Sequence, residues 1–206
     1  RFAKGESDAI PKLLLAMQLT VRGTPYLYYG EEIGMRDVSL ARSQIQDPVG
    51  KRYWPFNKGR DGCRAPMQWS AKQNAGFTNG EPWLPLNKDY PVRNVESQSA
   101  SPASMLAFYK SLIQLRRAHP ALNAGNLEMV QVENEDLLVY QRQAGDEKML
   151  IVLNFSKQIY TYQLPTQDFN KWELLYVGNE AMVAQMTENN LNLPGYGFGI
   201  LISRSE

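Results

Sequence analysis

The stretch TPYLYYG, residues 24–30, is a short apolar and aromatic run without charge, and Glu31 and Glu32 follow it directly. Such a run predicts a β-strand that is buried on both faces, as in a parallel sheet. Residues 7–22, which precede it, carry apolar side chains at helical spacing, and Gly23 ends that pattern. A helix, a buried strand and charged residues at the carboxyl end of the strand are typical of a β/α barrel.

A long loop and a second helix follow this strand. Prolines recur throughout residues 36–98, which predicts a loop that contains no long element. Residues 101–119 have the clearest helical pattern, with Ser101 as the expected cap, Pro102 at the first helical position and Pro120 as the end. The large aromatic residues of the loop are expected to bury area and so argue against disorder: Trp54, Phe56, Trp69, Phe77 and Trp83.

The pattern changes its period from about residue 126 onward. Apolar and polar residues then alternate in strand-like runs, which are residues 127–133, 136–143, 148–154, 159–164, 172–177 and 198–203. Short turns separate several of these runs, as at residues 144–147. The arrangement predicts an antiparallel β-sandwich of roughly 80 residues, with its boundary to the first part between Pro120 and Asn126.

The composition argues against several classes of function. A net charge of +1 gives no electrostatic case for nucleic acid or a membrane surface as a partner. One cysteine and one histidine exclude a thiolate metal cage and leave little room for histidine-based catalysis, and no cofactor or metal is expected. The single cysteine and the lack of a long apolar window fit a cytoplasmic protein. Because the sequence begins at Arg1 without an initiator Met, it is expected to be part of a longer protein.

Several residues of chemically active types stand near the ends of the predicted elements. Glu31 and Glu32 lie at the carboxyl end of the predicted strand, where barrel enzymes carry their chemistry. Neighbouring strand residues point in opposite directions, so this pair cannot be the two-carboxylate couple of a glycosidase, and it is expected to brace the strand end by hydrogen bonds. His119 is expected to be a solvated residue at a helix end, and Cys63 is expected to be a small packing residue.

The stretch GRDGCRAPMQW, residues 59–69, combines turn-forming residues with Arg60, Asp61 and Arg64. An arginine fork suits hydrogen bonding to sugar hydroxyls or carboxylates, and it stays charged. The alternative is an Arg–Asp pair that ties down the long loop. The residues alone leave both interpretations of Arg64 open.

Five stretches carry a resemblance through their order and spacing. They are YLYYGEEIGM (26–35), GRDGCRAPMQW (59–69), NAGFTNGEPWLP (74–85), NVESQ (94–98) and SMLAFYKSLIQLRRAHPAL (104–122). Together they resemble the C-terminal part of the α-glucosidases and oligo-1,6-glucosidases of the α-amylase superfamily, the family-13 glycoside hydrolases. The resemblance covers residues 1 to about 125, and the β-module that follows is compatible with the C-terminal domain of that family.

The resemblance implies the last portion of a (β/α)8 TIM barrel followed by a C-terminal antiparallel β-sandwich. Residues 1–122 would supply helix 7, strand 8, the long loop and helix 8 of the barrel, and residues 123–206 the sandwich. The nucleophilic aspartate, the acid/base glutamate and the aspartate of the Asn-His-Asp motif of the family have no counterpart here. This chain is therefore expected to hold no catalytic residue and to be inactive alone, with the missing N-terminal barrel segment as its partner and an oligosaccharide as the substrate.

Two substrate-binding residues carry over from the motifs of the family. The arginine before the (Thr/Ala)-Pro-Met-Gln-Trp segment, which in the family contacts the sugar of the cleaved bond, falls on Arg64, and Ala65 stands where threonine is commoner. The polar residue in IQDP (45–48) that resembles a family contact to the leaving-group sugar is Gln46. A glutamate often stands there in the 1,6-specific members, so the glutamine leaves the linkage preference open.

The activity that the resemblance implies is that of a retaining, exo-acting α-glucosidase on short oligosaccharides. Sucrose- or maltose-converting transglucosidases and isomerases of the same superfamily share similar motifs, and they differ in how well the closed pocket excludes water. A third alternative is a non-catalytic scaffold fragment, because some relatives keep the fold and have lost the carboxylates.

Overall fold

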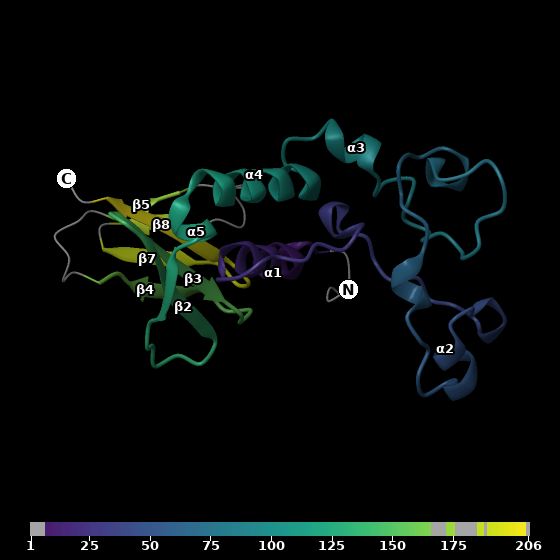
Figure 1. Ribbon diagram of the computed structural model, residues 1–206, viewed down its shortest axis with the longest axis horizontal. Coiled ribbons are helices and arrows are strands. Elements are labelled where there is room, and N and C mark those ends of the chain that lie inside the picture. The colour runs from purple at the N-terminus through teal and green to yellow at the C-terminus, as the bar shows by residue number, and fades with distance from the viewer. Residues whose placement is uncertain (1–6, 166–171, 176–184, 188, 205–206) are drawn as a thin grey trace. The chain divides into compact units, whose positions relative to one another are not determined.

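The computed structural model describes residues 7–165, 172–175, 185–187 and 189–204 (Figure 1). The chain divides into two compact units. The first unit consists of Arg1–Ser7 and Leu27–Ala107, and the second of Asp8–Tyr26 and Phe108–Glu206. Among the described residues, no helix has both the length and the apolar character that crossing a membrane requires.

The first unit is built from short helical segments that irregular chain connects. They are η1 (Glu31–Ile33), η2 (Arg42–Gln44), α2 (Pro48–Tyr53), η3 (Asp61–Arg64), η4 (Gln73–Gly76) and α3 (Val95–Ser99). The predicted absence of any long element between residues 36 and 98 is confirmed for this stretch, all of which the structure describes. Two small apolar clusters lie within the unit, and their buried members are Ile33, Met35, Met67 and Leu106 in one and Leu40, Ile45 and Leu84 in the other.

The strand expected at residues 24–30 is wrong for this chain. The segment has no strand conformation, and Tyr26 is 86% exposed while Tyr28 and Tyr29 are each about 40% exposed. A strand that is apolar on both faces forms only where parallel neighbours supply hydrogen bonds on its two edges. None of the described residues forms such a neighbour, so the segment stays without strand pairing.

The burial expected of the loop aromatics is also wrong for most of them. Phe56 is 97% exposed, and Trp69, Phe77 and Trp83 are each about half exposed. Trp54 packs against an apolar cluster, but it is only partly buried. Large exposed aromatic side chains that lie close together indicate a surface that contacts another molecule.

The second unit combines helices with two antiparallel sheets (Figure 1). The helices are α1 (Ala9–Thr20), α5 (Pro120–Asn123) and the part of α4 (Met105–Ala118) from Phe108 onward. The larger sheet has the order β1 (Asn126–Met129), β2 (Leu137–Ala144), β3 (Glu147–Asn154), β8 (Phe198–Arg204) and β5 (Glu173–Leu174). The smaller sheet has the order β4 (Tyr160–Gln163), β7 (Asn190–Leu193) and β6 (Gln185–Thr187).

The two sheets share one apolar core, which confirms the predicted sandwich. Its fully buried members include Leu150, Val152 and Leu201 from the larger sheet and Leu191 and Leu193 from the smaller one. Strands β6 and β7 were not predicted, because QMT and NLNL are very short runs. Residues 176–177 of the predicted run 172–177 lie outside the described residues.

Helices α1, α4 and α5 contact the larger sheet. Met149 and Ile151 are buried as completely as the neighbouring core residues Leu150 and Val152, and side chains alternate along a strand, so β3 is covered on both faces. The ring of Phe108 in α4 meets the ring of Phe198 in β8 edge to face, with 5.9 Å between their centroids. Helix α1 also contacts β3.

Helix α4 begins at Met105 and not at Ser101 as expected. Ser104 is the capping residue, since its Oγ accepts the N–H of Ala107 at 3.2 Å. The Oε1 of Gln98 accepts the N–H of Leu106 at 3.0 Å, which satisfies a second free amide of the first turn.

Two buried arginines bind the backbone at the ends of helices. Arg142 in β2 is fully buried, and its donors reach the carbonyl oxygens of Thr20, Leu122, Gly125 and Asn126. Arg116 in α4 donates to the carbonyl oxygens of Leu19, Val21 and Gly23, at and just beyond the carboxyl end of α1. Cations near the carboxyl end of a helix are favourable because the unpaired carbonyl groups there carry partial negative charge.

Candidate functional site

The first unit contains a cavity of about 590 Å³. Most of its wall is aromatic or apolar, and Glu32 and Arg64 are its charged members. The full lining consists of Tyr28, Tyr29, Glu32, Arg64, Ala65, Pro66, Met67, Trp69, Phe77 and Trp83. A concave, mostly aromatic surface with a few polar groups is the usual form of a small-molecule site.

A tight turn after Tyr29 brings Glu32 to this cavity. Gly30 has a φ of +82°, and a Cβ at this position would lie 2.5 Å from the Sδ of Met35, so glycine is required here. The Oε2 of Glu31 accepts the N–H of Tyr28 at 3.1 Å, so this glutamate braces the turn, although the strand that it was expected to brace does not form. Glu32 instead lines the cavity.

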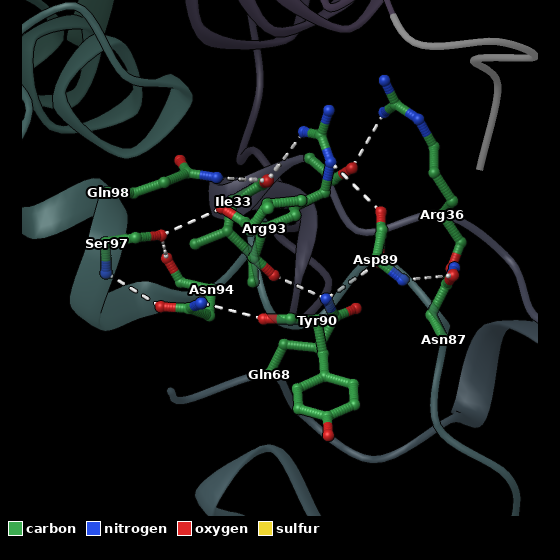
Figure 2. Close-up of polar contacts among 12 residues, drawn as sticks. Ile33, Arg36, Gln68, Asn87, Asp89, Tyr90, Arg93, Asn94, Ser97 and Gln98 are labelled. Atoms are coloured by element: carbon green, nitrogen blue, oxygen red, sulfur yellow. Dashed lines mark hydrogen bonds and ion pairs between the residues drawn. The ribbon is translucent and has the colours of Figure 1, made fainter. Parts of the chain in front are cut away.

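Figure 2 shows the polar contacts that hold this turn in place. The carbonyl oxygen of Ile33 accepts from Nε2 of Gln98 at 2.8 Å and from Nη1 of Arg93 at 3.1 Å. Arg93 forms an ion pair with Asp89 at 3.3 Å, and Asp89 accepts a further bond from Nε2 of the fully buried Gln68 at 3.0 Å. These contacts join three of the five stretches that carry the resemblance, so all three stretches contribute to holding the turn.

Backbone pairing continues this scaffold along the cavity wall. The N–H of Val95 donates to the carbonyl of Gln68 at 3.0 Å, and the N–H of Glu96 donates to that of Trp69 at 2.9 Å. The phenol of Tyr29 donates to the carbonyl of Ala65 at 2.9 Å, which ties the turn directly to the segment after Arg64.

Arg64 lines the cavity and at the same time contacts the loop. Its Nη1 lies 3.4 Å from Oδ2 of Asp47 and 3.9 Å from Oδ1 of Asp61. Its side chain is 41% exposed, so the arginine remains accessible to a ligand. The Arg–Asp pair that was expected to tie down the loop is therefore present. It does not prevent Arg64 from binding a ligand as well.

Gln46 lies at a different cavity from Arg64. A cavity of about 700 Å³ is lined by Arg42, Ser43, Ile45, Gln46 and Lys51. The Oε1 of Gln46 is 3.4 Å from Nζ of Lys51. The structure does not place the two predicted substrate-binding residues at one cavity, but the carboxylate of Asp61 links them. Its Oδ2 accepts the N–H of Gln46 at 2.6 Å, and its Oδ1 lies 3.9 Å from Nη1 of Arg64.

Asp47 is the residue that sequence reasoning missed. It caps α2, where its Oδ1 accepts the N–H groups of Val49 and Gly50, and its Oδ2 accepts the N–H of Arg60. These backbone bonds, the one from Gly50 first, lower the pKa of the Asp47 carboxyl, and the charge of Arg64 lowers it further. The Asp-Pro pair at residues 47–48 is a signal for such a cap, because proline suits the first turn of a helix.

The other two residues singled out from the sequence have local partners. The expectation of a solvated His119 is wrong, because its Nδ1 lies 2.9 Å from Oε2 of Glu147 and its side chain is only 12% exposed. The Sγ of Cys63 contacts the carbonyl oxygen of Arg60 at 3.0 Å. No cluster of three or more metal-ligating side chains of the His, Cys, Asp and Glu types occurs within the described ranges.

Matches to known protein families show which family has this arrangement of motifs. A model described as the catalytic domain of alpha amylase matches residues 3–125. The chain belongs to the alpha-amylase family. A second model, described as the C-terminal domain of maltogenic amylase, matches residues 127–200 of this family member. Its fold is accordingly the last portion of a (β/α)8 barrel followed by a C-terminal antiparallel β-sandwich, as the resemblance implied.

Relatives in the alpha-amylase family carry glucosidase names. A probable alpha-glucosidase of Rhizobium meliloti (strain 1021) is 35% identical over 199 residues, which are 96% of this chain and 35% of the relative. An oligo-1,6-glucosidase of Parageobacillus thermoglucosidasius is 33% identical over 186 residues, which are 82% of this chain and 33% of the relative. The chain thus spans about a third of the length of the curated relatives that it matches.

Solved structures of this family include enzymes with transferase names. The alpha-glucosyl transfer enzyme XgtA matches with a TM-score of 0.88 and 31% identity, over 96% of this chain and 36% of that one. The isomaltulose synthase SmuA from Protaminobacter rubrum matches with a TM-score of 0.81 and 29% identity, over 96% of this chain and 38% of that one.

Proposed function

We propose that this chain forms one wall of the active site of a retaining, exo-acting α-glucosidase that hydrolyses α-glucosidic bonds of short oligosaccharides. The observation that carries the proposal is the cavity in which Arg64 and Glu32 lie among aromatic side chains, next to the segment Pro66–Trp69. The names of the relatives support the reaction class. The barrel segment that holds the catalytic carboxylates is the partner that the proposal requires.

The proposed chemistry assigns this chain to binding and not to bond cleavage. In a retaining glycosidase, an aspartate or glutamate attacks the anomeric carbon, and a second carboxyl group about 5–5.5 Å away protonates the leaving oxygen and then activates water. Both carboxyl groups belong to the N-terminal barrel segment in this proposal. The chain by itself is therefore expected to be inactive.

Arg64 is proposed to orient the sugar whose bond is cleaved. Among the described residues, Nη1 is the nitrogen of Arg64 that the two aspartates face, so Nη2 and Nε are available to donate to a sugar hydroxyl. A fixed positive charge beside an attacking carboxylate also stabilises that carboxylate. The rings of Tyr28, Trp69 and Trp83 supply flat apolar surface against which a sugar face can pack.

Gln46 is proposed to contact the leaving-group sugar, at the separate cavity that Arg42 and Lys51 also line. For the domain organisation, we infer a division near residue 122, with the barrel portion before it and the sandwich domain after it. The ranges of the two matching family models, residues 3–125 and 127–200, support that division.

The alternative is a sucrose- or maltose-converting transglucosidase or isomerase. The observation that favours it is the likeness to the isomaltulose synthase SmuA and to a trehalulose synthase, MutB from Pseudomonas mesoacidophila MX-45, at a TM-score of 0.81 each. The two activities differ in the acceptor that takes the glucosyl group, which is water in one and a sugar in the other. The openness of the site to water decides between them.

The experiment that tests the proposal is product analysis of the full-length protein with maltose, isomaltose and sucrose. Proton NMR of the first products is expected to give free α-glucose, because retention releases the anomer that was bound. A rearranged disaccharide from sucrose would support the alternative activity instead. The 206-residue chain serves as the matched control, and it is expected to leave all three sugars unchanged.

A further inference from the structure

Asp61 lies at the centre of the loop that carries both candidate substrate-binding residues. Its side chain is 1% exposed, and its Oδ2 accepts the N–H of Gln46 at 2.6 Å and that of Asp47 at 2.7 Å. These bonds fix the segment before α2 to the first residue of η3. A buried carboxylate requires donors of this kind, because desolvation without them is costly.

The second carboxylate oxygen of Asp61 is buried without a hydrogen-bond partner within the described part of the chain. Arg64 stands opposite this oxygen, with 3.9 Å between its Nη1 and Oδ1 of Asp61. That distance is too long for a hydrogen bond but short enough for attraction between opposite charges. The orphaned oxygen is therefore directed at a residue of the cavity wall.

Asp47, the other carboxylate near Arg64, already accepts hydrogen bonds from the backbone with both of its oxygens. It accepts from Val49, Gly50 and Arg60, and its distance to Nη1 of Arg64 is 3.4 Å. Gly59, with a φ of +71°, lets the chain pass so close that a Cβ there would lie 2.7 Å from the carboxyl carbon of Asp47. Loss of Asp47 would thus disturb the loop itself, whereas Oδ1 of Asp61 has no such structural partner.

We propose that Asp61 is a positioning residue for Arg64, and that its unpartnered Oδ1 fixes the direction of the guanidinium toward the cavity by charge. The inference rests on the proposed role of Arg64 in binding the sugar. Through its Oδ2, the same carboxylate sets the backbone position of Gln46, so Asp61 links the two candidate residues. One side chain then controls the relative placement of two contacts that lie at different cavities.

The test compares substitutions at Asp61 and Arg64 in the full-length protein. Asp61→Asn keeps one oxygen for the N–H groups of Gln46 and Asp47 and replaces the charged Oδ1 with an amide nitrogen. We expect this variant to lose about tenfold in kcat/KM, the effect of about 1.4 kcal/mol on the barrier. In an Arg64→Ala background the same substitution should change kcat/KM by less than about twofold, because the group that it positions is gone.

Chemical rescue separates positioning from a purely structural role. Guanidinium ion at millimolar concentration should raise kcat/KM of Arg64→Ala where Asp61 is present, and should fail to raise it in the Asp61→Asn, Arg64→Ala double variant. Asp136→Asn, at an exposed aspartate of the second unit, is the matched control and should leave kcat/KM and rescue unchanged. Equal losses from Asp61→Asn in both backgrounds, or equal rescue of both variants, would overturn the inference.

Two measurements keep the inference separate from the proposed function. If the full-length protein acts on no α-glucoside, the proposed function fails, and a crystal structure of the Asp61→Asn variant decides the inference. A displaced Arg64 guanidinium supports the positioning role, and an unmoved one contradicts it. If melting curves show that Asp61→Asn does not fold, Asp61→Ser takes its place in every comparison, since its hydroxyl still accepts an N–H without carrying charge.

Discussion

Nη1 of Arg64 lies 3.4 Å from Oδ2 of Asp47 while the same arginine lines the aromatic cavity. From the sequence, an ion pair that holds the loop and a contact to a ligand were alternatives for Arg64. In the structure, the same side chain can make both. A partly exposed ion pair contributes only about 0–1 kcal/mol to stability. The loop around Arg64 is held chiefly by the backbone bonds of Asp47 and Asp61, so the arginine itself can be replaced without loss of the fold.

The hydrogen bonds of Gln98 are expected to stabilise the turn that holds Glu32. Its side chain joins the carbonyl of Ile33 to the N–H of Leu106. Gln98→Ala leaves both groups without this partner and should lower the free energy of unfolding by about 1–3 kcal/mol. Urea unfolding measures the loss, with Gln114→Ala on the exposed side of α4 as the control. An unchanged midpoint for Gln98→Ala would mean that water replaces the side chain without cost.

Arg142 should be among the residues on which the second unit depends most. It is fully buried, and it donates to carbonyl oxygens of Thr20, Leu122, Gly125 and Asn126. Arg142→Met fits an apolar chain into the same space but leaves those carbonyls unpaired, and a destabilisation of about 4 kcal/mol or more is expected. Gln143→Met on the same strand, at an exposed position, should change stability by less than about 0.5 kcal/mol. Equal effects of the two substitutions in urea unfolding would contradict this account.

Because the phenol of Tyr140 is buried, we expect the protein to lose stability in alkaline solution. Burial raises the pKa of Tyr140 to about 12, although the hydrogen bond with Thr20 and the charges of Arg142 and Arg116 oppose the shift. Because the phenol is charged when deprotonated, a raised pKa means that folding favours the neutral form. The contribution of Tyr140 to the free energy of unfolding is complete below pH 10. It is lost as the pH rises from about 10 to 12, by about 2–3 kcal/mol in total.

The measurement for Tyr140 is urea unfolding between pH 8 and pH 11 for wild type and Tyr140→Phe. The wild type should lose stability more steeply above pH 10 than the variant. In the variant, Thr20 keeps its bond to the carbonyl of Ala16, so the change removes the titrating phenol and its hydrogen bond with Thr20. Parallel curves for the two proteins would show that the phenol is not responsible.

The unpaired segment 24–30 should make the isolated chain prone to association. Tyr26, Leu27, Tyr28 and Tyr29 expose much of their side chains, and the segment has no strand partner among the described residues. Amide hydrogen exchange should be fast here and slow in β3, and sedimentation should detect a concentration-dependent dimer or larger species. Strong protection of residues 24–30 in a proven monomer would mean that the chain covers this segment in another way.

Local patterns predicted the elements whose partners lie within the chain. The strands β2, β3 and β8 form within the strand-like runs of the sequence, because residues of this chain pair with both of their edges and cover their faces. The apolar segment 24–30 has the composition of a barrel strand and yet forms none here. Composition sets the capacity for a strand, and neighbouring strands determine whether it forms.

The sequence named candidate residues of the site, but it did not reveal the contacts between them. Arg64 and Asp61 stand in a stretch whose residue types suggested either role, and the structure places both at the cavity wall or behind it. The contribution of Asp47 depends on a φ of +71° at Gly59 and on backbone donors from distant positions, which no spacing rule reveals. That Gln46 and Arg64 face different cavities likewise depends on the backbone of the loop, which no spacing rule reveals.

The most direct test of the account is kcat/KM of the full-length protein with a nitrophenyl α-glucoside for wild type, Arg64→Ala and Arg64→Lys, beside a melting curve for each. A charged hydrogen bond to a substrate is worth about 1.5–3 kcal/mol, so Arg64→Ala should lose about ten- to hundredfold in kcat/KM. Lysine should restore little, since it lacks the planar fork, and the melting temperatures should agree within a few degrees. An Arg64→Ala protein that melts early while its folded fraction keeps full turnover would contradict the account, because Arg64 would then be a loop tie alone.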